Sequence, residues 1–167
     1  MPPIDWVRPL TEAEAATVRA AREGAHLRYE GKTVPHRSCG VAIAETFGRP
    51  LPAYHSLRKG GLTGRGECGT AVAGRLVLGE LLGDPLGPPT PAVVEATLAY
   101  EAHWDARCGV DGDRACHRLM APFPDFQGPA RAARCTSLAA ETAALVAEVL
   151  VRAGHPVPLS PLPAPPR

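Results

Sequence analysis

Residues 129–154 read PARAARCTSLAAETAALVAEVLVRAG and contain the longest helical pattern of the chain. Pro129 suits the first position of a helix, and Gly154 suits the residue that follows its last turn. Spacings of three and four residues place one set of side chains on a single helix face: Cys135, Leu138, Thr142, Leu145 and Val149. The sequence therefore predicts a helix over 129–153 with a cysteine at the head of its apolar face.

Similar helical patterns precede this one. A capping box of Thr11 and Glu14 starts the first of them. The predicted helices before residue 129 cover 12–26, 39–47, 67–83, 91–107 and, as a short segment, 113–120. Aromatic residues make up only 5% of the chain and alanine is abundant, which favours closely packed helices over a sheet. We expect an all-α, compact single-domain bundle of about five helices with no strand.

Two segments lack helical periodicity. Residues 58–69, RKGGLTGRGECG, are rich in glycine and are predicted to form a loop. The last segment, His155 to Arg167, contains six prolines and is predicted to be an extended, mobile tail. The expected organisation is a helical domain over 1–154 followed by a Pro-rich tail over 155–167.

Charge and hydropathy exclude several classes of protein. The 18 Lys and Arg residues nearly balance the 17 Asp and Glu residues, so the chain lacks the basic field of a nucleic-acid binder. No stretch approaches the roughly 20 apolar residues of a membrane span. Residues 1–16 contain three acidic side chains where a signal peptide has an apolar run. We expect a soluble cytoplasmic protein that binds no nucleic acid and does not insert into membranes, and that is compatible with homo-oligomerisation.

The 167 residues include five cysteines, an odd number that suits metal or redox chemistry better than a disulfide scaffold in an unexported protein. Cys39, Cys68 and Cys116 lie at predicted helix starts, and Cys135 lies near another. The free amides and the dipole of a helix start favour a thiolate, so we expect lowered thiol pKa values there. Cys108 falls in a predicted polar turn, where its replacement should cost little. The four helix-start cysteines are the candidate site.

The spacing of these cysteines excludes several known sites, because it contains no C-x-x-C pair. A zinc ribbon, a thioredoxin-type dithiol, a bacterial ferredoxin run and a covalently attached haem all need such a pair. Any shared site must therefore be assembled by the fold. The competing interpretation is that each thiol is simply a small buried side chain of the core.

Four sequence patterns resemble a known family. They are HRSCGVAIAETFG at Cys39, GLTGRGECGTAVAGRLVLGELLG at Cys68, ACHRLM at Cys116 and ARCTSLAAETAALVAEVL at Cys135. Together they resemble the C_GCAxxG_C_C family, whose members are described as redox-active, over residues 20–152. The resemblance implies a small helical protein that uses these four cysteines, and related domains in split-Soret cytochromes imply an iron–sulfur centre. The chain departs from the family pattern at Thr70 and Ala73, where the family has Ala and Gly.

Other motifs give weaker candidates. Gly64, Gly66 and Gly69 form a GxGxxG pattern, but no strand precedes it, so we expect no nucleotide. The same loop carries Arg58, Lys59 and Arg65, which suit either an anion-binding nest or a solvated turn.

Three titratable side chains lie close to the cysteines in sequence. His36 precedes Cys39 by three residues and is a candidate ligand or proton donor. His117 follows Cys116 and is expected at the surface, because adjacent helical positions point about 100° apart. Glu67 suits either proton transfer from Cys68 or a simple interaction with the helix dipole.

These observations lead to three functional hypotheses. In the first, Cys39, Cys68, Cys116 and Cys135 bind an iron–sulfur cluster, with [2Fe–2S] favoured, and the protein passes electrons to a partner oxidoreductase. It is then an electron carrier or accessory redox protein rather than a stand-alone enzyme. In the second, Cys68 attacks in thiol–disulfide exchange and Cys39 resolves. In the third, the chain is a non-catalytic helical binding module with structural zinc, whose tail acts as a spacer.

Overall fold

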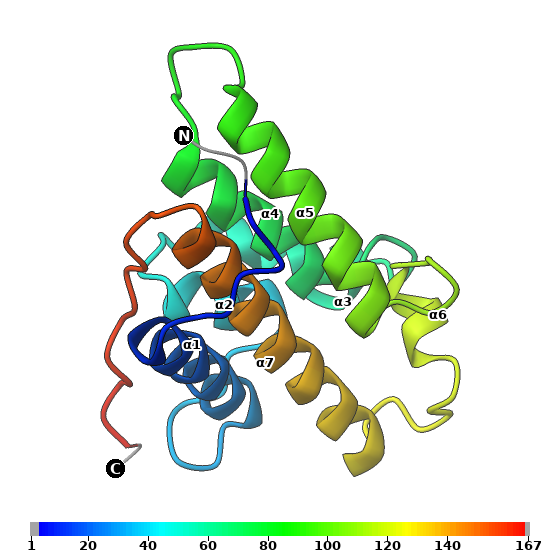
Figure 1. The fold of residues 1–167 in the computed structure, drawn as a ribbon. Coiled ribbons are helices and arrows are strands. Elements are labelled where there is room, and N and C mark those ends of the chain that lie inside the picture. The colour runs from blue at the N-terminus through cyan, green and yellow to red at the C-terminus, as the bar shows by residue number, and fades with distance from the viewer. Residues whose placement is uncertain (1–3, 166–167) are drawn as a thin grey trace.

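The computed structural model describes residues 4–165, which form seven α-helices, one short 3-10 helix and no strand (Figure 1). The elements are α1 Glu12–Glu30, α2 Gly40–Thr46, η1 Pro52–Leu57, α3 Arg58–Gly61, α4 Gly69–Leu82, α5 Pro91–Cys108, α6 Cys116–Met120 and α7 Pro129–Arg152. The all-α prediction is confirmed. The expected number of about five helices is too low: α6 lies within the short segment predicted over 113–120, whereas α3 is a single turn inside the segment predicted as a loop.

Helix α7 runs through the middle of the molecule and organises the core. Helix α1 packs along it, α5 and α4 pack against other parts of it, and α2 fills the space beside α4 (Figure 1). Its residues from Leu138 to Leu150 are almost all buried. Trp104 of α5 is fully buried and donates a hydrogen bond from Nε1 to Thr142 Oγ1 of α7 at 2.9 Å. Small alanine side chains on α1 and α7 allow these helices to pack closely.

The predicted loop over 58–69 begins with a strained turn. Lys59 and Gly60 adopt left-handed backbone conformations with φ of 50° and 57°, so α3 is a sharp turn rather than a regular helix. A left-handed conformation is costly for a lysine, and it persists only where neighbouring structure fixes it. The glycine-rich sequence correctly indicates an irregular segment but does not predict the turn.

The tail is extended, as predicted, but its described part is not free. The backbone amide of Ser160 donates to the carbonyl of Thr46 at 2.9 Å. Arg28, only 1% exposed, donates to the carbonyls of Ser160 and Pro161 at 3.2 and 2.8 Å and pairs with Glu45. A buried guanidinium needs acceptors for its five donors, and the tail supplies two of them. The extended course is confirmed for residues 155–165, and residues 160 and 161 are held to α1 and α2 by these hydrogen bonds; residues 166 and 167 lie outside the described residues.

The prediction for Cys108 is also wrong. Cys108 is the last residue of α5 rather than part of a polar turn, and it is 2% exposed within the hydrophobic core. Helix α5 continues one residue beyond the expected end at Arg107, and Gly109 follows as its C-cap. Replacing Cys108 therefore alters core packing and is not expected to be free of cost.

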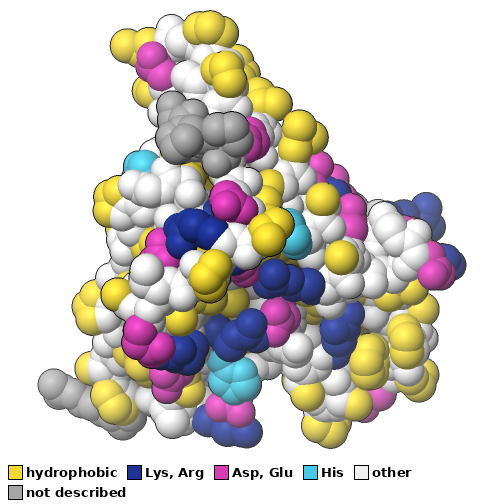
Figure 2. All heavy atoms as spheres, in the orientation of Figure 1, with side chains coloured by type: hydrophobic (Ala, Val, Ile, Leu, Met, Phe, Trp, Pro, Cys, Tyr) yellow, Lys and Arg dark blue, Asp and Glu magenta, His cyan; other side chains and the backbone are white. Residues whose placement is uncertain are grey.

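The surface of the described residues carries both signs of charge. Figure 2 shows Lys and Arg side chains interspersed with Asp and Glu, and apolar side chains gathered towards the end where α4 and α5 join. Leu86 and Leu98, at 96% and 63% exposed, belong to that end. No helix within residues 4–165 has both the length and the hydropathy that crossing a membrane requires.

Candidate functional site

Four cysteines line one small cavity of ≈ 20 Å³. Cys39 and Cys68 are the N-cap residues of α2 and α4, Cys116 begins α6, and Cys135 lies near the start of α7. The structure thus brings together, from four helices, the same four cysteines that the sequence singles out. The other residues that line the cavity are mostly apolar: Tyr29, Gly69, Thr70, Leu119, Met120 and Leu138.

Close backbone contacts bring Cys39 and Cys68 together. A Cβ on Gly69 would lie 2.1 Å from the carbonyl oxygen of Leu57 and 3.1 Å from the Cβ of Cys39. A Cβ on Gly40 would lie 3.0 Å from the carbonyl oxygen of Gly69. Glycine is therefore required directly after each of these two cysteines, because the starts of α2 and α4 meet there.

Cys116 is joined to Cys68 through the backbone. The amide of Cys68 donates to the carbonyl of Arg114 at 2.7 Å, and the amide of Cys116 donates to the carbonyl of Gly66 at 2.9 Å. The Arg114 side chain is held in turn by Asp105 at 2.7 Å and Glu101 at 3.2 Å, both on α5. These reciprocal hydrogen bonds fix the start of α6 beside the start of α4. Sequence reasoning missed them because two loops far apart in the chain form the pairing.

Burial dominates the thiol pKa values. It raises the pKa of Cys39 to about 11, although the Lys59 backbone amide opposes this shift with a hydrogen bond to the thiolate. It also raises the pKa of Cys116 to about 11, and the neighbouring cysteines add to that shift. The pKa of Cys68 rises for the same reason, against hydrogen bonds from Thr70 and the Ala71 amide. The predicted lowering of these pKa values at helix starts is wrong, because desolvation outweighs the helix-start amides.

This direction gives a pH-dependent prediction for the reduced, metal-free protein. Alkylation of Cys39 and Cys116 by iodoacetamide will be slow at neutral pH and will rise with pH towards about 11, since only the thiolate reacts. The same groups lose their protons near 9 when unfolded, so the folded state will lose stability as pH rises from about 9 to about 11. Peptide mapping by mass spectrometry measures each rate. Half-maximal alkylation of either thiol at or below neutral pH would contradict the prediction.

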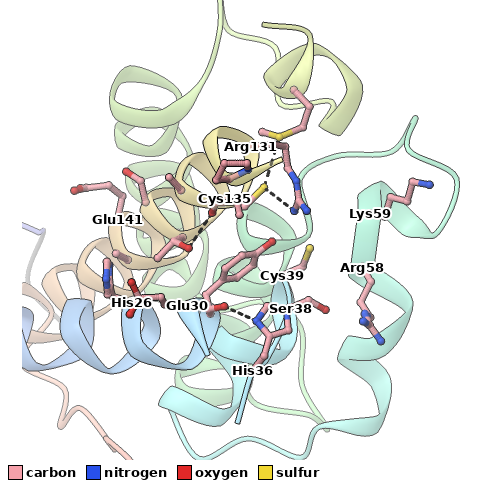
Figure 3. A pocket seen from close by; sticks show the side chains of 18 of the residues that line it. His26, Glu30, His36, Ser38, Cys39, Arg58, Lys59, Arg131, Cys135 and Glu141 are labelled. Atoms are coloured by element: carbon pink, nitrogen blue, oxygen red, sulfur yellow. Dashed lines mark hydrogen bonds between the residues drawn. The ribbon is translucent and has the colours of Figure 1, made fainter. Parts of the chain in front are cut away.

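A larger cleft of ≈ 1190 Å³ adjoins the cavity, and Figure 3 shows the side chains that line it. Cys39, Cys116 and Cys135 line both spaces, together with Tyr29 and Met120. Cys68, which is 8% exposed, lines the cavity but not the cleft. Three of the four sulfur-bearing side chains are thus accessible from the cleft, while the fourth is sealed behind them.

Comparisons with protein-family models, with curated proteins and with solved structures find no match to this chain. The resemblance to the C_GCAxxG_C_C family stays a prediction that depends on the cysteine patterns alone. The chemistry of the site is therefore inferred from its own residues.

The titratable residues near the cysteines in sequence do not line the cavity. The Nδ1 atom of His36 contacts the carbonyl oxygen of Tyr29, and its ring lies in the cleft. His117 is exposed, as expected. Glu67 is exposed and pairs with Arg75 at 2.9 Å, which favours a structural role over proton transfer.

The glycine-rich loop does not form an anion nest. The amides of Gly64 and Gly66 donate to the carbonyls of Lys59 and Gly60 at 2.7 and 3.1 Å. The amide of Arg65 donates to the hydroxyl of Thr63 at 3.2 Å. Because these donors are used within the loop, they are not directed at a ligand.

A single metal ion and an iron–sulfur cluster need different arrangements of ligands. A tetrahedral zinc ion with bonds of about 2.3 Å would hold its sulfurs about 3.8 Å apart. Within residues 4–165, no three or more His, Cys, Asp or Glu side chains are grouped to hold one metal ion. In a four-cysteine cluster, no more than two thiolates bind the same iron, so no such group of three is required. Within the described residues, the four cysteines therefore line one cavity without forming a preformed site for a single ion.

The size of the cavity limits what it can hold without rearrangement of its wall. A volume of ≈ 20 Å³ is room for about one water molecule. The inorganic core of a cluster is larger, so its binding needs outward movement of the cavity wall. Cys39, Cys116 and Cys135 line both the cavity and the cleft. These side chains can therefore move towards the cleft without displacing residues of the packed core.

Proposed function

We propose that this protein is a small redox protein in which Cys39, Cys68, Cys116 and Cys135 bind an iron–sulfur cluster and exchange electrons with a partner oxidoreductase. The observation that carries the proposal is that four thiols from four helices line one cavity. No carboxylate or imidazole group among the described residues lines it with them. Thiolates are the usual ligands of iron–sulfur clusters, whereas carboxylates and imidazoles favour other metals.

The surroundings of the sulfurs suit such a cluster. When bound, the cluster supplies a one-electron redox couple. The hydroxyl oxygen of Thr70 lies 3.2 Å from the Cys68 sulfur, and a hydrogen bond donated to a bound sulfur stabilises the more negative, reduced state. The guanidinium of Arg131 lies 3.9 Å from the Cys135 sulfur and adds a positive charge. The lining is mostly apolar, and [2Fe–2S] is the cluster type that we expect.

Access to the site is compatible with electron exchange. Cys39, Cys116 and Cys135 are partly exposed and line the cleft. A cluster held there has one side near the surface, where a partner protein can approach. Cys68 on the other side anchors the site to α4 and to the core.

Anaerobic reconstitution with ferrous iron and sulfide tests the proposal. The expected product contains about two irons and two sulfides per chain, and its visible absorption bleaches on reduction. A parallel sample with zinc in place of iron and sulfide is the control for non-specific thiol binding. A colourless, iron-free protein after reconstitution would show that the proposal is wrong.

The alternatives receive less support from the structure. In the thiol–disulfide hypothesis, Cys68 is the attacking thiol. That thiol does not line the cleft, and burial raises its pKa. Loss of two thiols on mild oxidation, without metal uptake, would nevertheless favour exchange over a cluster. The binding module assigned a spacer role to the tail, whose described part packs against α1 and α2.

A further inference from the structure

The cleft beside the cysteine cavity has the size and lining of a site for a small organic molecule. Its volume of ≈ 1190 Å³ is slightly above the range of roughly 300–1,000 Å³ that is usual for such pockets. Apolar side chains line part of it, among them Leu62, Met120, Phe126, Ala132 and Ala140. The cleft lies against α1 and α7, which pack against each other in the core, and against the single turn α3.

The charges that line the cleft are unevenly compensated. Arg19, Arg22 and Lys32 each form an ion pair with a glutamate. No carboxylate of residues 4–165 forms an ion pair with the other three cations of the lining, which are Arg58, Lys59 and Arg131. Uncompensated positive charge is therefore concentrated in one part of the cleft.

Those three cations lie at the end of the cleft that meets the cysteines. Arg131 is 3.9 Å from the Cys135 sulfur, and Figure 3 shows Arg58 and Lys59 on the neighbouring α3 segment. Lys59 Nζ and Arg131 Cζ lie 5.1 and 4.5 Å from the centroid of the same Phe126 ring. Both cations therefore contact the Phe126 ring, and the left-handed backbone of Lys59 fixes where its side chain leaves α3.

We propose that this cleft binds a small organic anion. The negatively charged group, a carboxylate, phosphate or sulfonate, interacts with Arg58, Lys59 and Arg131. The apolar body of the ligand lies along α1 and α7, against Met120 and the alanines of α7. The proposal goes beyond the proposed redox function, because binding of the anion needs no cluster. It places the ligand directly beside the cysteines.

Two fluorescent probes of nearly equal shape test the proposal. Anilinonaphthalene sulfonate has an apolar aromatic body and one negative charge, and phenyl-naphthylamine has a similar body without the charge. We expect one sulfonate probe to bind per chain in reduced protein that is kept free of metal by a chelator. The double variant Arg58→Gln/Lys59→Gln should lower the affinity for the sulfonate probe by about tenfold. It should change the affinity for the neutral probe by less than about twofold.

The control variants make the result specific. Arg65→Gln removes an exposed arginine of the same loop that does not line the cleft, and it should leave both probes unchanged. Arg58 and Lys59 are not buried, so the double variant should keep the unfolding midpoint of the parent protein. Arg131→Gln is a second, independent variant with the same expected loss. Unchanged sulfonate binding in both cleft variants, or equal weakening of both probes, would overturn the proposal. Failure to assemble a cluster would not affect it.

Discussion

Replacement of Gly74 by Ala will lower the free energy of unfolding by about 2–3 kcal/mol, although alanine is the better helix former. A Cβ at position 74 would lie 2.1 Å from the hydroxyl oxygen of Tyr100, which is 1% exposed between α4 and α5. That hydroxyl donates to the carbonyl of Ala71 at 2.9 Å, so it cannot move without losing a buried hydrogen bond. The added methyl group must therefore push α4 and α5 apart.

The same substitution at Gly79 is the matched control. Gly79 lies in the same helix, is exposed, and a Cβ added to it would meet no neighbouring heavy atom within 4 Å. Gly79→Ala should raise the free energy of unfolding by about 0.5–1 kcal/mol through helix propensity alone. Thermal and urea unfolding measure both changes, with a fall of about 5–10 °C expected for Gly74→Ala. Equal effects of the two substitutions would contradict the contact between α4 and Tyr100.

This contact also concerns the cysteine site. Ala71, which accepts the Tyr100 hydrogen bond, lies in the first turn of α4, three residues after Cys68. The family resemblance places a glycine at position 73, and this chain has Ala73 there with Gly74 next. The structure shows that the glycine at 74 makes the close helix contact. The sequence pattern predicts a small residue in this turn but not which position faces α5.

Local patterns in the sequence predicted the helices well, because helix periodicity and caps depend on neighbouring residues. The capping box at Thr11 is present, and α7 begins at Pro129 as expected. Helix α1 extends beyond the expected end at residue 26 to Glu30, where Gly31 caps it with φ of 72°. The pattern underestimates this helix because its last turn carries the buried Arg28 and Tyr29, which only the tertiary structure accommodates.

Properties that depend on burial could not be predicted from the sequence. The position of a thiol at a helix start suggested a lowered pKa, but the neighbouring helices remove it from water and reverse the direction. The burial of Arg28, which the tail and Glu45 enclose, likewise has no signal in the sequence around it. The four cysteines line one cavity because each lies at the head of an apolar face, and apolar faces turn inward in a helical bundle.

The largest functional effect is expected from Cys68→Ala, which should reduce the iron content of the reconstituted protein by at least about tenfold. Cys68 is the cavity cysteine that is sealed from the cleft, so no exogenous thiol or water can easily take its place. Its sulfur also lies 3.2 Å from the hydroxyl oxygen of Thr70 in the first turn of α4. Loss of this ligand leaves three thiols, which are all on the cleft side of the cavity.

Cys108→Ala is the matched control, because both thiols are buried and the substitutions remove the same atom. Cys108 is 2% exposed and Cys68 is 8% exposed, but only Cys68 lines the cavity. Each substitution should lower the free energy of unfolding by about 1 kcal/mol through lost packing. Iron and sulfide analysis should then give the parent content for Cys108→Ala and little of either for Cys68→Ala. The contradicting result is equal iron content in the two variants together with matching unfolding transitions. It would mean that Cys68 is only a core residue and does not bind a cluster.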